Sequence, residues 1–139
     1  MNNLLEESVI GIVNPDAKEQ VRSTILANLD KYNIIYQYDK NTDIEEMANQ
    51  LIQLQTGMMK FYGELEKNTH TKKTTFNILV IIKEINEIFD NDNYKYVDHI
   101  KFAVNSMARL GKNVGIQIVY TTTADLDNSD LVNLTTKTI

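Results

Sequence analysis

The residues best suited to bind a metal ion are two histidines and a short acidic cluster. His70 and His99 lie in different segments, and their spacing does not match that of paired metal ligands. Asp90 and Asp92 alternate with asparagines, but the cluster lacks the glycine and the closing glutamate of an EF-hand loop. The chain has no cysteine, which excludes a thiolate nucleophile and Cys-ligated zinc or iron–sulfur sites. We therefore expect no metal site.

A second polar group follows the apolar run 8–13. Asn14 is a favourable helix N-cap, and Pro15 suits the first helical position because that position needs no N–H donor. Asp16 and Glu19 add negative charge at the positive end of the expected helix. This pattern predicts a tight strand-to-helix turn.

Composition limits both the size and the class of the protein. A chain of 139 residues is enough for one hydrophobic core and too short for two, and 42% hydrophobic with 24% charged residues excludes extended disorder. The formal net charge of −5 is the wrong sign for a domain that holds nucleic acid by neutralising phosphates. The sequence has no signal-peptide pattern and no apolar run of membrane-spanning length, so we expect a soluble, cytoplasmic protein.

Apolar runs alternate with amphipathic helical segments along the chain. The expected strands are residues 8–13, 32–38, 76–82, 114–121 and 134–139, and 76–82 is apolar on both faces, as in the centre of a parallel sheet. A helix that includes residues 97–110 is expected to end at Gly111 or Asn113. This alternation predicts an α/β three-layer domain with a mainly parallel five-stranded sheet, whose ligand sites lie at the carboxyl ends of the strands.

The longest expected helix carries one apolar stripe. Its members step by three and four residues: Ile44, Met47, Leu51, Leu54, Met58, Phe61 and Leu65. Two interpretations remain open. The stripe packs within its own domain, or it forms a dimeric coiled coil, although Gly57 and Gly63 weaken an isolated helix.

The order of motifs in the second half of the chain resembles the FtsK/SpoIIIE family of P-loop ATPases. An apolar strand ending in a carboxylate (ILVIIKE) precedes a helix ending ARLGKNVG, the strand IQIVYTTT and a segment ending LTTKTI. The resemblance is best over residues 76–139 and covers most of the chain. It implies the RecA/FtsK-type P-loop NTPase fold, strand order 5-1-4-3-2, and one degenerate ATPase domain over residues 1–139. Within the family, the acidic, motif-poor chain is most similar to the third, C-terminal ATPase domain of the EssC-like ATPases of type VII secretion in Gram-positive bacteria.

The family's phosphate-binding loop has the pattern G-x-x-x-x-G-K-[ST], in which backbone amides and the lysine bind phosphates and the hydroxyl holds magnesium. With Lys18 aligned to the motif lysine, Ile12 and Ala17 replace the glycines and Glu19 replaces the hydroxyl residue. The loop is therefore degenerate. Lys18 is either a weak phosphate contact or a solvated helix residue.

The other two motifs of the family are altered as well. The Asp-Glu pair that ends a Walker B strand reads Lys83 and Glu84, so an ammonium replaces the magnesium-side carboxylate while Glu84 keeps the position of the catalytic base. The sensor Ala-Thr-Gln reads as threonines, with Thr123 in place of the amide. The resemblance thus implies no active catalytic residue, no metal site, and at most a weak nucleotide pocket made of Lys18 and Lys83 with Asn14, Asp16, Glu19 and Thr123.

The expected function follows from the simultaneous loss of these motifs. The resemblance implies a catalytically inactive domain of a type VII secretion motor that recognises substrates or regulates neighbouring ATPase domains by protein contact. Its partners would be ATPase domains of the same motor or secreted proteins, and no nucleic acid is expected. ATP and magnesium would be bound weakly or not at all. The domain would lie at the cytoplasmic face of the cell membrane and would be attached to the membrane only indirectly, through a longer chain. Two alternatives stay open: a DNA translocase or plasmid-transfer ATPase module, and an ATPase completed in trans.

Overall fold

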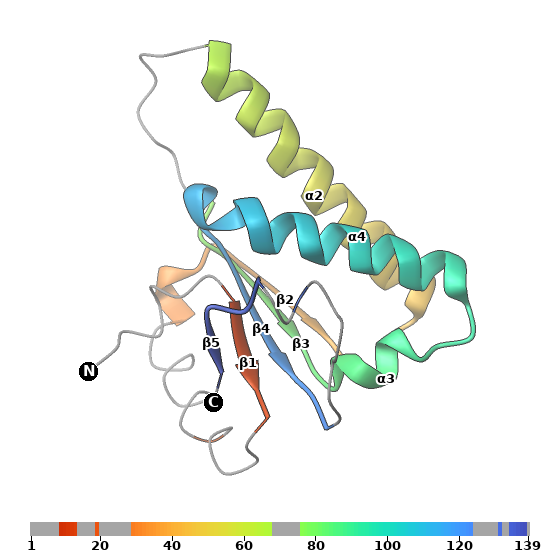
Figure 1. Ribbon diagram of the computed structural model, residues 1–139. Coiled ribbons are helices and arrows are strands. Elements are labelled where there is room, and N and C mark those ends of the chain that lie inside the picture. The colour runs from red at the N-terminus through yellow and green to blue at the C-terminus, as the bar shows by residue number, and fades with distance from the viewer. Residues whose placement is uncertain are drawn as a thin grey trace.

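A five-stranded parallel sheet forms the centre of the protein, described here from a computed structural model (Figure 1). The structure describes residues 9–13, 19, 29–67, 76–123, 131 and 134–138. The strands are β1 (Val9–Ile12), β2 (Ile34–Tyr38), β3 (Ile78–Ile82), β4 (Ile116–Thr121) and β5 (Lys137–Thr138). Their spatial order is β2-β3-β4-β1-β5, which confirms the predicted order, although β5 contributes only two residues.

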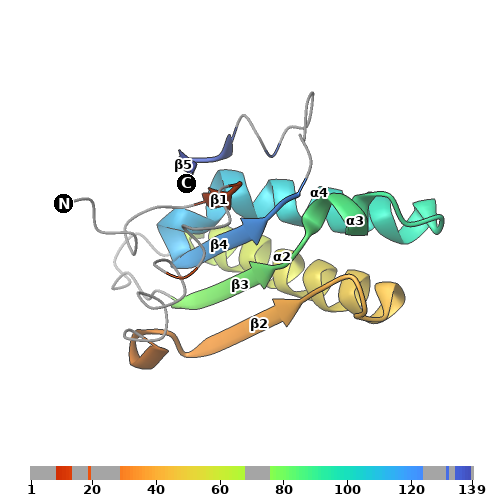
Figure 2. The same cartoon turned by 90° about the horizontal axis from the view of Figure 1, so that it is seen from below.

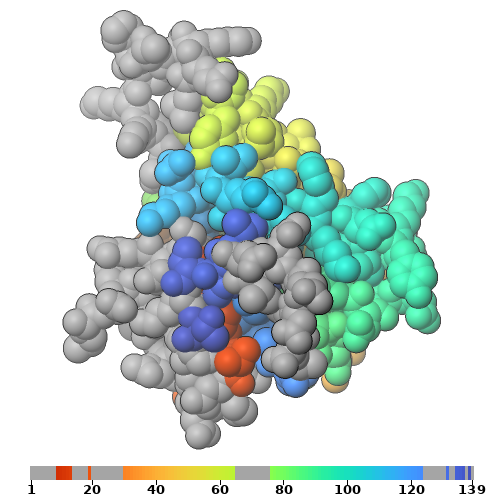
Figure 3. All heavy atoms as spheres, in the orientation of Figure 1, coloured from red at the N-terminus to blue at the C-terminus, as the bar shows by residue number. Residues whose placement is uncertain are grey.

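Two long helices cover one face of this sheet. They are α2 (Ile44–Lys67) and α4 (Tyr94–Leu110), and Figure 2 shows both on the same side of the strands. A short helix, α3 (Ile85–Phe89), follows β3, and two 3₁₀ turns, η2 (Leu29–Lys31) and η3 (Gly111–Val114), precede β2 and β4. Atoms of α4 lie on the surface drawn in Figure 3. On this helix, Phe102 is 58% exposed.

The core lies mainly between the sheet and these helices. On the side of α2 and α4 the strands contribute buried residues such as Val80, Ile82 and Ile118. The other face is apolar too, with Ile10 and Leu79 among its buried residues. This two-sided burial explains why β3 is apolar at every position, as a central strand of a parallel sheet must be.

The apolar stripe of α2 packs within its own domain. Met47, Leu51 and Met58 are buried, while Ile44, Leu54 and Phe61 are half-buried against the same core. This excludes the coiled-coil interpretation for this stripe, because side chains already buried in the monomer cannot also form a seam between two chains.

Several element boundaries differ from the sequence expectation. Each strand is shorter than its apolar run, and α3 occupies a segment for which no helix was expected. The expected end of the long helix at Gly111 is confirmed, because α4 ends at Leu110 and Gly111 is its C-cap. Gly111 itself has right-handed helical φ and ψ, and the chain continues as η3 to Gly115, whose φ of 80° is left-handed. The left-handed residue that typically terminates a helix is therefore Gly115.

The helix expected after Asn14 and the third layer that it would form fall on residues 14–18 and 20–28, outside the described part of the chain. His70 likewise lies outside it, whereas His99 is an exposed residue of α4. In the part of the chain that the structure describes, no helix combines the length and the apolarity needed to cross a bilayer.

Candidate functional site

The carboxyl ends of β3 and β4 meet at one edge of the sheet. The two strands pair in parallel, with Ile82 opposite Tyr120, so the turn after β3 lies beside residues 121–123. Lys83 and Glu84 form that turn, and the Glu84 backbone N–H donates to Thr121 Oγ1 at 2.8 Å. The third neighbour is β1, because the Thr122 N–H donates to the Ile12 carbonyl at 3.2 Å.

Glu84 has an unusual backbone conformation and a side chain that forms an ion pair. Its φ of 51° and ψ of 53° are left-handed, and it forms the N-cap position of α3. Its carboxylate Oε2 lies 3.6 Å from Lys40 Nζ, and Glu87 Oε2 lies 3.5 Å from the same nitrogen. The carboxylates of Glu84 and then Glu87 raise the pKa of Lys40. Glu84 is therefore part of an ion-pair cluster with Lys40 and Glu87.

Asn86 joins the turn after β3 to the segment after β4. Its side-chain Oδ1 accepts from the Thr123 backbone N–H at 3.0 Å and from Thr122 Oγ1 at 3.2 Å. Its Nδ2 donates to Thr123 Oγ1 at 3.1 Å. The Thr123 hydroxyl is thus hydrogen-bonded to a neighbouring amide, and this network links the turn after β3 to the segment after β4.

The charged side chains at this edge form an ion-pair cluster and leave one exposed lysine. Lys83 is solvent-exposed, and the carboxylate next to it in sequence, that of Glu84, is shared with Lys40. Within residues 29–67 and 76–123 and the shorter described stretches, no group of three or more His, Cys, Asp or Glu side chains is placed to hold a metal ion. The edge thus presents the Lys83 ammonium, a carboxylate that pairs with Lys40, and a set of hydroxyl and amide groups.

The structure brings together only part of the predicted pocket. Lys83, Glu84 and Thr123 share the edge, and Glu19 is an exposed helical residue. The remaining predicted residues, Asn14, Asp16 and Lys18, lie outside the described residues.

Sequence reasoning missed three residues of this edge: Lys40, Asn86 and Glu87. A signal for Lys40 was present, because it follows β2 closely and the carboxyl ends of parallel strands meet at one edge of the sheet. The two α3 residues gave no such signal, since a five-residue helix is too short for a periodic pattern.

The left-handed backbone of Glu84 gives a testable expectation. A Glu84→Gly variant should be more stable than Glu84→Ala by about 1 kcal/mol, because both lose the carboxylate but only glycine adopts positive φ without strain. Denaturant unfolding of the two variants measures this difference. Equal stability would mean that the positive φ carries no strain. An alanine substitution at the exposed Asn49 of α2 serves as the control and should change the stability little.

Two solved structures share this fold. The conjugation coupling protein TcpA of pCW3, in its monomer form with ATPγS, superposes with a TM-score of 0.73 at 16% identity over 92% of this chain. The cytoplasmic domain of the Thermomonospora curvata type VII secretion ATPase EccC gives a TM-score of 0.54 at 11% identity over 91% of this chain. The chain spans 46% of the first protein and 19% of the second. No protein-family model matches the sequence, and no curated protein does. At identities this low, the superpositions establish the fold alone, an α/β domain built on a parallel sheet.

Proposed function

We propose that this chain is a catalytically silent ATPase-like domain that acts by protein contact. The observation that carries the proposal is the exposed ammonium of Lys83, which stands next to Glu84 where the family has a metal-side carboxylate. Without a metal ion and a bound phosphate, a carboxylate at the position of the catalytic base has no water to activate. In this structure the Glu84 carboxylate pairs instead with Lys40, at 3.6 Å.

The magnesium side of the site supports the same proposal. Phosphoryl transfer needs a divalent cation that bridges the phosphates and offsets the developing charge. Lys83 presents an ammonium at the position where the family's metal-side carboxylate stands, and like charge repels the cation. Thr123, at the sensor position, is hydrogen-bonded to Asn86. We therefore expect neither tight Mg-ATP binding nor hydrolysis.

The expectation for the phosphate-binding loop is based on the sequence. Glu19 stands where a magnesium-binding hydroxyl belongs and is exposed. Asn14 and Asp16 are expected to occupy backbone amides that a phosphate would need, which leaves Lys18 as a weak contact only. Any residual nucleotide binding should therefore be metal-free and should use Lys83 and Lys18.

The motor that we propose for this domain is a type VII secretion ATPase of the EssC kind, with this chain as its degenerate C-terminal domain at the cytoplasmic face of the membrane. The similarity in fold to a type VII secretion ATPase supports this proposal. In that setting, other ATPase domains of the motor or secreted proteins are its partners. A pull-down with neighbouring ATPase domains and secretion substrates would test these contacts.

Calorimetric titration with Mg-ATP and a phosphate-release assay on the chain test the absence of catalysis. We expect no binding in the low micromolar range and no turnover, and Lys83→Asp alone should not restore hydrolysis because the loop around Lys18 remains altered. Low-micromolar binding, or turnover that Glu84→Gln abolishes, would show that the domain is an active ATPase.

A DNA-coupling role is the second candidate. The observation in its favour is the similarity in fold to the pCW3 conjugation coupling protein. The net charge of −5 opposes it, since neutralisation of phosphates supplies most nonspecific affinity for DNA. Duplex binding tighter than about micromolar at physiological salt would favour this second candidate.

A further inference from the structure

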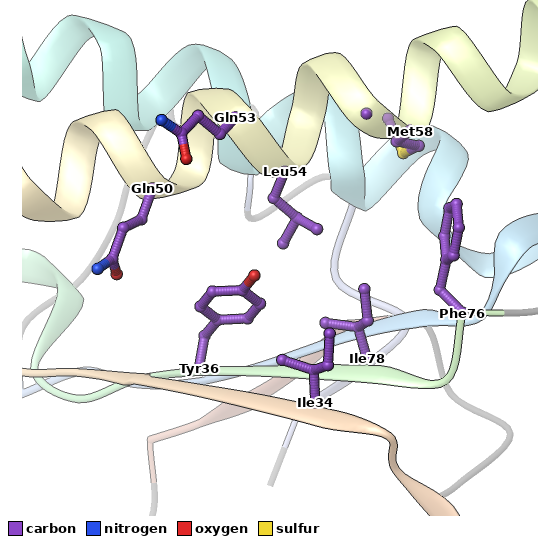
Figure 4. A pocket seen from close by; sticks show the side chains of 9 residues that line it. Ile34, Tyr36, Gln50, Gln53, Leu54, Met58, Phe76 and Ile78 are labelled. Atoms are coloured by element: carbon purple, nitrogen blue, oxygen red, sulfur yellow. The ribbon is translucent and has the colours of Figure 1, made fainter.

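An open apolar groove lies between α2 and the outermost strand, β2. Its volume is about 610 Å³, and it is lined by Ile34, Tyr36, Gln50, Gln53, Leu54, Gly57, Met58, Phe76 and Ile78. Figure 4 shows Tyr36 and Ile34 rising from the strand towards the helix, with Leu54 directed down between them and α2. Ile34 is 48% exposed.

The strand below the groove lies at an edge of the sheet. β2 is one of the two terminal strands, and among the described residues only β3 pairs with it, so within that part of the chain its other side is free. The Tyr38 carbonyl accepts from the Lys83 N–H, so it faces β3. Because backbone groups alternate between the two sides of a strand, those of Ile35 and Gln37 face away from β3. An unpaired edge next to an apolar groove is suited to receive another strand.

We propose that a second copy of this chain binds here through β2. Antiparallel pairing about a two-fold axis at Tyr36 places Ile35 of one copy opposite the second copy's Gln37, and each such pair exchanges both backbone hydrogen bonds. The two Tyr36 side chains then lie next to each other over the axis, and Ile34 lies opposite the second copy's Tyr38. The pairing joins the two sheets into one and covers the exposed part of Ile34.

Charge on α2 favours a second copy over other occupants. Gln50, Gln53 and Gly57 line the groove from α2, and the same helix face continues by steps of four and three to Glu46 at one end and Lys60 at the other. A two-fold axis perpendicular to the sheet sets the two α2 helices antiparallel on the same face. Centred on Gln53, this stripe places Glu46 of each copy opposite the second copy's Lys60. Both are exposed, so the surface is complementary to itself in charge.

The remaining rim positions do not oppose this arrangement. Gln50 and Gln53 carry no charge, and Gly57 presents no side chain, with no atom within 4 Å of an added Cβ. A glycine at the contact lets two helices approach closely. The inference rests on the free edge and on this stripe, and it holds whether or not the domain hydrolyses ATP.

Sedimentation velocity of the full chain over a range of concentrations tests the proposal. We expect reversible dimerisation with a dissociation constant of about 10–100 µM, as is typical of a small interface. Hydrogen exchange at the Gln37 amide should slow as the dimer forms. A chain that remains monomeric up to about 1 mM would overturn the proposal and leave the groove to a different partner.

Gln37→Pro is the matched test of the free edge. Proline lacks the N–H that the partner strand needs, and it is tolerated on an edge strand where that N–H faces away from β3. We expect loss of dimer at all accessible concentrations with an unchanged circular dichroism spectrum. The control Gln37→Thr keeps the N–H and favours strand, so it should dimerise as the parent does. Equal dimerisation of the proline variant would exclude pairing through β2.

Charge reversal on α2 tests the geometry of the pairing independently of strand stability. Glu46→Lys alone or Lys60→Glu alone places like charges across the two-fold axis and should weaken the dimer about tenfold. The double variant restores opposite charges and should recover the parent dissociation constant to within about twofold. Absence of rescue in the double variant would rule out the proposed alignment of α2.

Discussion

Replacing Leu51 with alanine should lower the free energy of unfolding by about 3–4 kcal/mol. Leu51 belongs to α2, is 0% exposed, and packs in the core beneath that helix with residues such as Met47 and Ile100. Truncation removes buried methyl groups and leaves a cavity that the surrounding helices and sheet fill only in part. Chemical denaturation monitored by circular dichroism measures the loss.

The matched control is Gln53→Ala on the same helix, whose side chain is exposed. It should change stability by no more than about 0.5 kcal/mol. A loss below about 1 kcal/mol for Leu51→Ala would contradict the burial of the α2 stripe in its own domain. The stability of the Leu51 variant should also be independent of protein concentration in a dilute series, because the side chain is buried inside one chain.

Replacing Gly11 with valine should cost about 2–3 kcal/mol of stability. Gly11 lies in the interior strand β1, opposite Tyr120 of β4. A Cβ at Gly11 would approach the Tyr120 hydroxyl oxygen to 2.5 Å and its Cζ to 2.7 Å. The Tyr120 ring is 4% exposed, and its hydroxyl lies 2.8 Å from Thr135 Oγ1, so it has little space to retreat. Overpacking of this kind forces shifted backbone or off-rotamer side chains.

Two further variants test whether the clash with Tyr120 causes this loss of stability. Gly63→Ala in α2 meets no atom within 4 Å and should raise stability by roughly 0.5–1 kcal/mol through helix propensity. Tyr120→Leu removes the hydroxyl and the distal ring atoms, so Gly11→Val should cost less in that background than in the parent. Additive losses in the double variant would show that the clash with Tyr120 is not the cause.

The sheet could be predicted from the sequence because its signals are strong. The segment containing β3 is apolar at every position, which indicates burial on both faces, and the α2 stripe keeps one helical face over its whole length. The strand order itself came from the resemblance to a family, since periodicity indicates which segments are strands but not which strands are neighbours.

The same reasoning could not predict the strand boundaries, the short helix α3 or the conformation of the glycines after α4. Gly111 and Gly115 are both glycines near a helix end, and only Gly115 has positive φ. Gly111 is instead constrained by contact, because a Cβ there would lie 2.9 Å from the Ile116 Cβ. Sequence cannot distinguish a glycine required by its dihedral angle from one required by close approach.

The candidate site was predicted only as far as the strand ends specify it. Glu84 and Thr123 follow β3 and β4, so the topology places them at one edge. The ion pair with Lys40 and the amide network of Asn86 depend on side-chain positions and on the left-handed turn at Glu84. None of these leaves a periodic trace in the sequence.

The place of β1 in the sheet determines when the chain can fold. Both of its neighbours, β4 and β5, come from the last part of the sequence, and the Val9 N–H donates to Thr136 Oγ1, 127 residues away. At the usual rate of translation, β1 leaves the ribosome roughly 5–20 s before the strands that flank it. The pairs β2–β3 and β3–β4 are separated by much shorter stretches of chain than β1 and β4, so closing the loops between them costs less entropy. Among the described strands, β1 thus precedes its partners in the sequence and is among the last to be paired, since β4 and β5 must be synthesised before it can pair.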